Sequence, residues 1–266
     1  MFRKWRKRWR RRRAIKRLSP RLEEVRMALE AELSEPVALV EHGSSGRDSV
    51  FKVVGKAGTL AALRVNNPHL AHKSLAVDQP FQVLQPAARV QREWDCYSAA
   101  YVAGLSPQPI WRAADAIACR YVDGQRLFDR LIAKPGSFWR LNAMAARALG
   151  KLHQLDLVHM DASLANVLAD GDQLRFIDFE YGPAAHLSKA DMRAYDHLRL
   201  VESGIKFAPA ELVGECEEWL AVVNDVARDA FTDCTIEHLA PAIGRVMQAN
   251  ALRAKLGAQF PALRFH

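Results

Sequence analysis

The residues best suited to chemistry lie in one segment, residues 157–182, with the sequence LVHMDASLANVLADGDQLRFIDFEYG. It holds His159, Asp161 and Asn166 in an H-x-D-x-x-x-x-N spacing, and Asp178 follows Asn166 by twelve positions. A carboxylate can accept or orient the proton of a hydroxyl group, while an amide oxygen and a second carboxylate can hold Mg²⁺ against phosphate groups. This set of residues is therefore suited to moving a phosphoryl group from a nucleotide to a hydroxyl.

The chain around these residues predicts a loop followed by a hairpin. Asp161 and Asn166 lie on the loop, and the first strand begins at Val167. Residues 169–172 form the turn, and an apolar return strand leads to Asp178. We expect this hairpin to bring Asp178 beside Asn166.

The same spacing, followed by an apolar strand that ends in Asp178-Phe179, resembles the catalytic segment of the protein-kinase-like superfamily. That group includes protein kinases, aminoglycoside phosphotransferases, choline and thiamine kinases, and lipopolysaccharide-core sugar kinases. The resemblance implies an α+β, bilobal fold with a small antiparallel-sheet N-lobe and a mainly helical C-lobe. It also implies Asp161 as the catalytic residue, Asn166 and Asp178 as ligands of Mg²⁺, and ATP as the phosphoryl donor. The alternative is that His159 and Asp161 are polar loop residues that satisfy backbone groups.

Three strand-like runs, 37–43, 49–54 and 59–65, come earlier in the chain and are separated by glycine-bearing turns. In a kinase-like fold, a turn of this kind covers the nucleotide phosphates with backbone N–H groups. Gly43 and Gly46 could do so here, although an ordinary hairpin explains them equally well.

The third of these runs carries Arg64 where protein kinases have a lysine that reaches the phosphates, and choline-kinase-like enzymes also have arginine there. A guanidinium can hold phosphate oxygens through two parallel hydrogen bonds. Residues 87–104 predict a helix, in which Glu93 matches the glutamate that pairs with this cation. The alternatives are that Arg64 is a surface strand residue in a protein of impaired activity, and that Glu93 is an exposed helix residue.

Two further strands are predicted before a break in the pattern after Tyr121. The resemblance places the adenine of ATP against the backbone near Tyr121 and Val122. We therefore expect three parts: a basic arm and helix over residues 1–35, an N-lobe that binds nucleotide phosphates over 36–123, and a C-lobe over 124–266 that carries the catalytic loop, the metal site and the acceptor site.

The features after the catalytic loop argue against a protein acceptor. Met160 replaces an arginine that is common in protein kinases, and Glu180 replaces the glycine after Asp-Phe. About ten residues separate Phe179 from the next helical pattern at Lys189. This is too short for an activation loop with a peptide-binding platform, so we expect a non-protein acceptor that carries a hydroxyl.

The composition predicts a globular, cytoplasmic chain with a cationic N-terminus. Half of the 266 residues are hydrophobic, and the formal net charge is +8. Eleven of the 38 Lys and Arg residues lie in residues 1–20, which leaves 27 basic and 30 acidic residues for the remainder. The four cysteines are far apart and predict reduced thiols without structural zinc. We found no apolar segment long enough for a signal peptide or a transmembrane helix.

The basic arm, residues 1–18, includes Trp5 and Trp9 among its cations. Cations with interfacial aromatic residues favour an anionic membrane surface, while nucleic acid is less favoured and a solvated arm is the third possibility. Ser19 and Pro20 predict the start of a separate helix that continues to residue 33.

These observations favour an ATP- and Mg²⁺-dependent phosphotransferase that acts on a sugar of a membrane glycolipid, such as the lipopolysaccharide core, at the inner face of the cytoplasmic membrane. The Asp-x-x-Arg-Leu pattern that begins at Asp196 and the basic arm resemble lipopolysaccharide-core kinases. The alternatives are a small-molecule kinase of the choline, thiamine or aminoglycoside type, an atypical protein kinase, and a kinase-like scaffold without catalysis.

Overall fold

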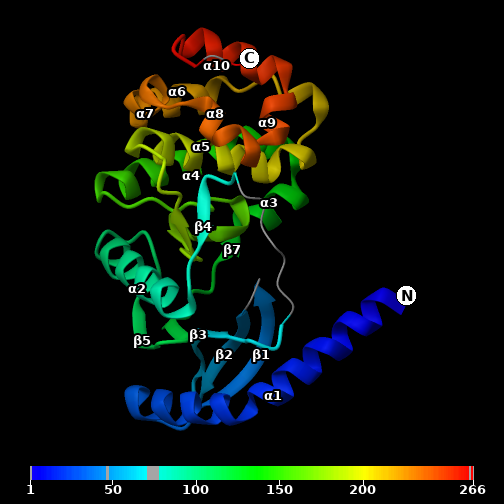
Figure 1. The fold of residues 1–266 in the computed structure, drawn as a ribbon, viewed down its shortest axis with the longest axis vertical. Helices are drawn as coiled ribbons and strands as arrows, with labels where there is room; N and C mark the ends of the chain where they lie inside the picture. The colour runs from blue at the N-terminus through cyan, green and yellow to red at the C-terminus, as the bar shows by residue number, and fades with distance from the viewer. Residues whose placement is uncertain (1, 46–47, 71–77, 264, 266) are drawn as a thin grey trace. The chain divides into compact units, whose positions relative to one another are not determined.

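The computed structural model describes residues 2–45, 48–70, 78–263 and 265, and it confirms the predicted α+β class (Figure 1). The chain divides into two compact units. The first unit comprises Met1–Leu75, Gln85–Trp94 and Pro107–Val122, and the second comprises Ala76–Leu84, Asp95–Ser106 and Asp123–His266. Within the described residues, no helix combines the length and the apolar composition needed to cross a bilayer.

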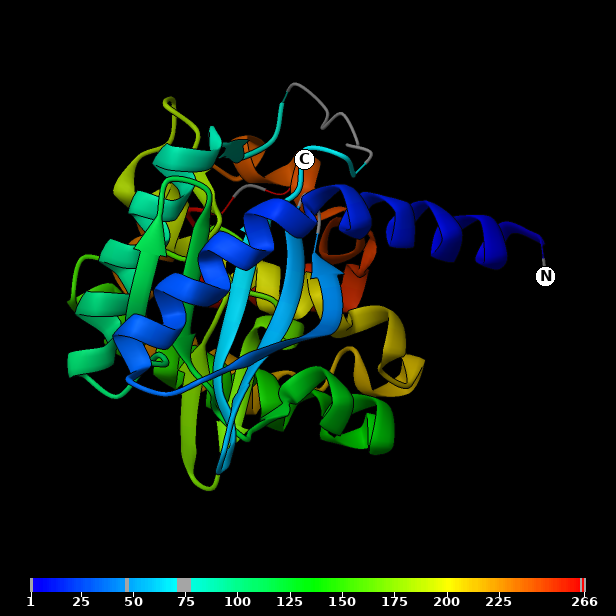
Figure 2. The same cartoon turned by 90° about the horizontal axis from the view of Figure 1, so that it is seen from below.

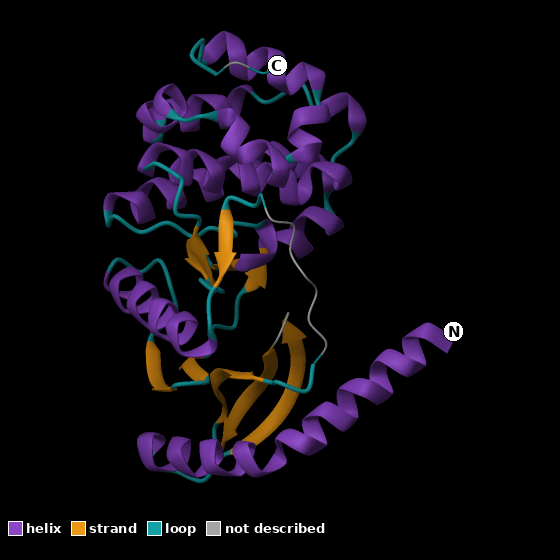
Figure 3. Ribbon diagram, viewed as in Figure 1, coloured by secondary structure: helices purple, strands orange, loops and turns teal. Residues whose placement is uncertain are grey.

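The first unit is built on a five-stranded antiparallel sheet with the strand order β1-β2-β3-β6-β5 (Figure 3). Its strands are β1 (Ala38–Ser45), β2 (Asp48–Gly55), β3 (Gly58–Asn66), β5 (Pro109–Ala113) and β6 (Ala116–Arg120). Alternate residues of β2 and β3, such as Phe51, Val53, Leu63 and Val65, are buried in one core. Because side chains alternate between the two faces of a strand, this pattern defines one apolar face of the sheet.

Helix α1 (Phe2–Leu33) packs on that face (Figure 2). Leu18, Val25 and Leu29 join the sheet residues in the core. The prediction of a separate helix from Pro20 was wrong, because α1 is continuous through that residue. Proline has no N–H to donate to the carbonyl of Lys16, and the hydroxyl of Ser19 donates to that carbonyl at 2.9 Å.

Helix α2 (Pro86–Val102) begins in the first unit and ends in the second. The other helices of the second unit are α3 (Leu127–Ala133), α4 (Phe138–Gln154), α5 (Lys189–Gly204), α6 (Glu217–Val226), α7 (Arg228–Asp233), α8 (Ile236–Leu239), α9 (Gly244–Gln248) and α10 (Asn250–Gln259). Single 3₁₀ turns are η1 (Pro135–Ser137), η2 (Leu164–Asn166), η3 (Ile205–Phe207), η4 (Ala210–Leu212) and η5 (Ala240–Ala242). The strands are β4 (Phe81–Val83), β7 (Gln125–Arg126), β8 (Val167–Asp170), β9 (Gln173–Phe176) and β10 (Tyr181–Pro183).

The core of the second unit forms where α4 packs against α5 and α6. The indole rings of Trp139 and Trp219 lie 5.6 Å apart, and Trp139 Nε1 donates to the carbonyl of Leu212 at 2.7 Å. A Cβ atom at Gly150 would lie 2.7 Å from the side chain of Val226. The close approach of α4 and α6 therefore requires glycine at position 150.

The predicted hairpin is present as β8 and β9, in a small sheet with the order β7-β8-β9. Strand β4 was not predicted, and it pairs with β10. This pairing accounts for the assignment of residues 76–84 to the second unit, whereas we expected residues 36–123 to form one lobe. Residues 95–106 also belong to the second unit, since Leu105 accepts a backbone hydrogen bond from Phe176 at 2.7 Å.

Candidate active site

Asp161 and Asn166 are joined by hydrogen bonds within the loop that leads into β8. Asn166 Nδ2 donates to the main-chain oxygen of Asp161 at 3.0 Å and to Asp161 Oδ2 at 3.1 Å. The N–H of Ser163 donates to the same Asp161 carbonyl at 2.7 Å. Asn166 lies in the 3₁₀ turn η2, so the loop is tight and the two side chains are held together.

Asp178 follows the return strand of the hairpin, β9, which ends at Phe176. The N–H of Ile177 donates to the main-chain oxygen of Asn166 at 2.9 Å, and the N–H of Asp178 donates to Tyr97 Oη at 2.8 Å. Asp178 has a φ of 72°, a left-handed conformation that Asp tolerates better than most residues. Phe179 packs edge-on against the Tyr97 ring at 5.2 Å. The predicted neighbours Asn166 and Asp178 are therefore linked through the backbone of Ile177.

The second oxygen of Asp161 contacts Arg199, on α5. Arg199 Nε donates to Asp161 Oδ1 at 3.0 Å, and Arg199 Nη2 lies 2.9 Å from the same oxygen. Burial raises the pKa of Asp161, Arg199 and His159 act against that rise, and the negative charge of Asp178 adds to it. The carboxylate of Asp178 is thus close enough to Asp161 for its negative charge to raise the pKa of Asp161.

The backbone of the loop that carries Asp161 is held by Asp196, which is fully buried on α5. Asp196 Oδ2 accepts from the N–H of His159 at 2.7 Å, and Oδ1 accepts from the N–H of Met160 at 2.8 Å. Although burial acts to raise the pKa of Asp196, the hydrogen bond with His153 and other polar contacts lower it. Asp196 is therefore an ionised anchor for a loop in which Met160 has a φ of 66°.

His159 connects the loop to the segment after β9 that carries Asp178. Its Nε2 lies 3.0 Å from the carbonyl oxygen of Ile177, and its ring packs 4.6 Å from the ring of Phe179. Burial lowers the pKa of His159, so the imidazole is neutral and donates to that carbonyl. This places His159 in a bracing role.

The oxygen atoms at this site fit Mg²⁺. Because the amide nitrogen of Asn166 is used by Asp161, its Oδ1 is the atom that can face a cation, together with the carboxylate of Asp178. Mg²⁺ commonly binds one or two protein oxygens and completes its shell with water and phosphate. Within the described part of the chain, no three His, Cys, Asp or Glu side chains gather as a metal cage.

The first unit contains a separate buried cluster of charged residues around Arg64. Arg64 Nη1 lies 3.3 Å from Glu93 Oε1, and Arg64 Nη2 lies 2.7 Å from Asp48 Oδ2. Asp48 also accepts from Arg89 Nη2 at 2.7 Å through its other oxygen. The side chain of Arg64 is 13% exposed, whereas Asp48 and Glu93 are 1% exposed, so the guanidinium is the group of this cluster that a ligand can reach. Its binding to phosphate stays a prediction.

The other predicted nucleotide contacts are less well supported. Gly43 lies at an irregularity in β1, where a Cβ atom would meet no described atom within 4 Å, and Gly46 lies outside the described residues. The N–H of Tyr121 already donates to the carbonyl of Leu60 at 3.0 Å, and its ring contacts the ammonium of Lys52 at 4.8 Å. The predicted contact of Val122 with adenine stays a prediction.

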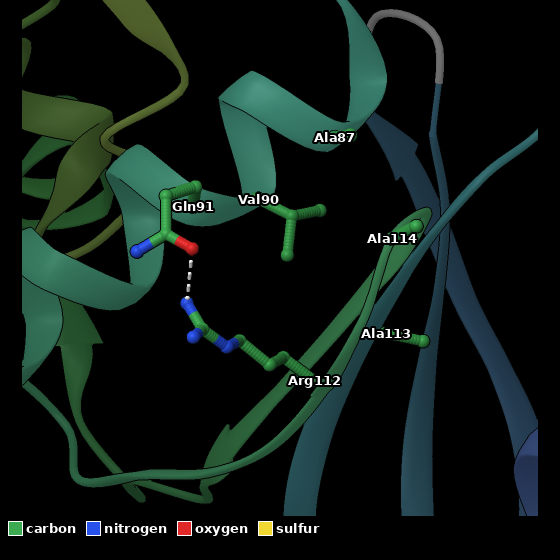
Figure 4. A pocket seen from close by; sticks show the side chains of 6 residues that line it. All are labelled: Ala87, Val90, Gln91, Arg112, Ala113 and Ala114. Carbon is green, nitrogen blue, oxygen red and sulfur yellow. Dashed lines mark hydrogen bonds between the residues drawn. The ribbon is translucent and has the colours of Figure 1, made fainter.

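A shallow pocket lies elsewhere on the first unit, between α2 and β5 (Figure 4). It is lined by Ala87, Val90, Gln91, Arg112, Ala113 and Ala114. Arg112 Nη1 donates to Gln91 Oε1 at 2.8 Å, and the guanidinium lies 4.8 Å from the ring centre of Trp94. The lining includes none of the predicted site residues, and its one cation is already paired.

Sequence reasoning did not assign the residues that hold the site in place. Asp196 and Arg199 were noted as a pattern, without a role, and Asp48, Arg89 and Tyr97 gave no signal. A polar residue inside a helix or strand is usually solvated, so its sequence position alone does not reveal a buried contact. The Asp-x-x-Arg spacing was the one available sign, since it places two charged residues on the same helix face.

Comparisons with known proteins give similarities only at the level of whole structures. No family model matches the chain, and no curated protein matches it. A choline/ethanolamine kinase family protein from Mesorhizobium loti is 17% identical, with 90% of this chain and 98% of that chain covered and a TM-score of 0.46. The PknI kinase domain of Mycobacterium tuberculosis is 19% identical, with coverages of 84% and 95% and a TM-score of 0.48. A proposed fructosamine-3-kinase from Thermobifida fusca is 16% identical, with coverages of 90% and 97% and a TM-score of 0.44. Because the identities and TM-scores are low, we base no functional conclusion on these similarities.

Proposed function

We propose that this chain is a magnesium- and ATP-dependent phosphotransferase that acts on a hydroxyl group of a non-protein acceptor. The proposal rests on one observation: Asp161, Asn166 and Asp178 are brought together in the second unit by the loop and hairpin. Two oxygen ligands for a metal beside a separate carboxylate are the groups that phosphoryl transfer requires. A bracing role alone would not need a second carboxylate, Asp178, whose negative charge raises the pKa of Asp161.

Each residue has a defined part in the proposed reaction. Bound magnesium ATP supplies the phosphoryl group and the cation that offsets its charge. Asp161 orients the acceptor hydroxyl and receives its proton as the new oxygen–phosphorus bond forms and the bond to the departing nucleoside diphosphate breaks. Asn166 Oδ1 and Asp178 hold the metal ion. Most of the rate enhancement then comes from positioning and from charge stabilisation.

Arg64 is the candidate group for the phosphates that are not transferred. Glu93 and Asp48 orient its guanidinium through the contacts described above. A buried arginine with two carboxylate partners keeps its orientation before the ligand arrives, which lowers the entropic cost of binding. The assignment of Tyr121 and Val122 to adenine binding is part of the same proposal.

The length of the segment after Phe179 supports a non-protein acceptor. Helix α5 begins at Lys189, as predicted, and the short strand β10 occupies part of the intervening chain. Little chain is left to form a platform for an extended peptide. This supports a small molecule or a glycolipid in preference to a protein substrate.

Within that class we favour a sugar of a membrane glycolipid, such as the lipopolysaccharide core, with a choline-, thiamine- or aminoglycoside-type acceptor as the alternative. Support comes from residues 1–20 of the chain, which hold eleven cations and no acid. Trp5 and Trp9 are 64% and 51% exposed, as side chains that enter a membrane interface must be. We therefore propose that residues 1–18 bind an anionic membrane surface at the inner face of the cytoplasmic membrane.

The proposed reaction is tested by magnesium-dependent consumption of ATP in the wild type and in Asp161→Asn. The substitution keeps the size of the side chain and removes the proton acceptor, so turnover should fall by about a hundredfold or more. Nucleotide binding, measured by calorimetry, should stay within about threefold of the wild type. Asp156→Asn, at an exposed ion pair with Lys189, is the matched control and should retain turnover. Full turnover in Asp161→Asn would remove Asp161 from its role, and the absence of turnover in the wild type with lipid extracts would contradict the enzymatic proposal.

A further inference from the structure

The guanidinium of Arg199 lies directly on the carboxylate that we assign to the acceptor hydroxyl. Two of its nitrogens, Nε and Nη2, contact Asp161 Oδ1 at 3.0 and 2.9 Å. The other oxygen of Asp161 contacts Asn166. Any hydroxyl group that approaches Asp161 therefore also approaches Arg199.

Among the described residues of the second unit, Arg199 is the cation that contacts Asp161. Residues 157–166 and 177–181 contain no lysine or arginine. Lys189 and Arg193, the first cations of α5, contact the exposed carboxylate of Asp156. Glu202, one turn after Arg199, accepts hydrogen bonds from Arg245 and from the N–H of Val246. Within the described part of the second unit, Arg199 is thus the cation that lies against Asp161, while Asp178 is assigned to the metal.

Arg199 also has unused capacity for hydrogen bonding. A guanidinium has five N–H donors. Within the described residues, the hydrogen bonds and ion pairs of Arg199 all go to one oxygen, Asp161 Oδ1. The side chains of Arg199 and Asp161 are 25% and 22% exposed, so a ligand can reach both. The planar group can bind a carboxylate or a phosphate through two parallel hydrogen bonds.

We infer that Arg199 determines acceptor specificity and that the acceptor is an anionic sugar, with its carboxylate or phosphate beside the reacting hydroxyl. This inference rests on the proposed function, because it takes Asp161 as the residue that meets the hydroxyl. It disfavours a cationic acceptor such as choline or an aminoglycoside, since an amine would be brought against a guanidinium. It selects between the two acceptor classes that the sequence left open.

The test uses four sugars that differ only at carbon 6: glucose, glucuronate, glucose 6-phosphate and 6-amino-6-deoxyglucose. Their binding to the full chain, with magnesium and a non-hydrolysable ATP analogue present, is measured by saturation-transfer NMR. The wild type should bind glucuronate or glucose 6-phosphate at least about tenfold more tightly than the amino sugar. Comparing the two anionic sugars shows whether a carboxylate or a phosphate is preferred.

The variants Arg199→Met and Arg199→Lys separate a charge effect from a structural effect. Arg199→Met keeps the apolar stem and should lose the preference for anionic sugars, whereas Arg199→Lys should restore much of it. If Arg199 had a purely structural role, its replacement would weaken the binding of all four sugars equally. Equal binding of the four sugars by the wild type, no binding of the anionic pair, or a preference for the amino sugar would each overturn the inference. Magnesium-dependent ATP turnover, measured in separate samples that contain ATP in place of the analogue, reports independently on the proposed function.

Discussion

Replacing His197 by phenylalanine should remove much of the acid sensitivity of the folded chain. His197 is completely buried on α5, next to the rings of His153 and Phe231 at 5.3 and 6.1 Å. Neither of its ring nitrogens has a hydrogen-bond partner among the described residues. Burial, with the nearby His153, lowers the pKa of His197 from 6.5 to about 3, although the charge of Asp196 acts the other way.

The sign and size of the effect follow from linkage between protonation and folding. The pKa of His197 is lower in the folded state, so between about pH 6.5 and pH 3 the unfolded chain binds a proton that the folded chain does not. The contribution of neutral His197 to the free energy of unfolding is therefore fully present above pH 6.5 and is lost as the pH falls. At pH 5 an unfolded histidine with a pKa of 6.5 is almost fully protonated, which costs about 2 kcal/mol relative to pH 8.

The assay is urea unfolding of the wild type and of His197→Phe at several pH values between 8 and 5. The difference in the free energy of unfolding between the two proteins should change by about 2 kcal/mol over that range, or about 4–8 °C in melting temperature. His197→Leu provides a second variant in case the larger ring does not fit. Since the change with pH is compared, a constant loss of packing energy does not affect the result. Parallel stability curves would show that His197 accepts a proton in the folded protein, and the buried, neutral assignment would then be wrong.

Two further predictions concern the first unit. Asp48→Asn should destabilise the protein by about 3 kcal/mol or more in urea unfolding, because two buried guanidiniums lose the carboxylate between them, and it should weaken ATP binding. Asp115→Asn, which breaks a partly exposed pair with Arg21, should cost about 1 kcal/mol or less, and equal losses in the two variants would contradict the buried cluster. Deletion of residues 2–10 should abolish salt-dependent co-sedimentation of the protein with anionic vesicles. Its co-sedimentation with zwitterionic vesicles should not change. The deletion removes six cations and keeps the buried Ala14 in place, so retained co-sedimentation would count against the membrane proposal.

The parts of the fold that could be predicted from the sequence are those with short-range signals. The hairpin of β8 and β9 follows from apolar strands on either side of a polar turn, and α5 begins where its helical pattern begins, at Lys189. Strand β4 could not be predicted, because it is short and pairs with β10 about a hundred residues later. The continuity of α1 also escaped prediction, since it depends on a hydroxyl of Ser19 that replaces a missing N–H.

In the candidate site, too, residues that are close in the sequence could be predicted, and contacts between distant residues could not. Asp161 and Asn166 are local in the chain, and their spacing specifies one tight loop, so the sequence identified them. The contact between Asp161 and Arg199 spans 38 residues, and that between Asp48 and Arg89 spans 41. A charged residue in a helix has the same local preference whether it is solvated or buried, so contacts over such distances need the three-dimensional fold.

The backbone of the loop that carries Asp161 explains why α5 has to be fixed so firmly. Met160 has a positive φ, a conformation that costs of order 1–3 kcal/mol and persists only where the surroundings impose it. Asp196 imposes it by accepting a hydrogen bond from the N–H of Met160 itself. Helix α5 is in turn fixed at its start by Asp191, in a capping box with Ser188, and near its end by Glu202. A helix held at both ends positions side chains more accurately than a loop does. The carboxylate of Asp161, although it lies on a loop, therefore takes its position from a helix that is fixed at both ends.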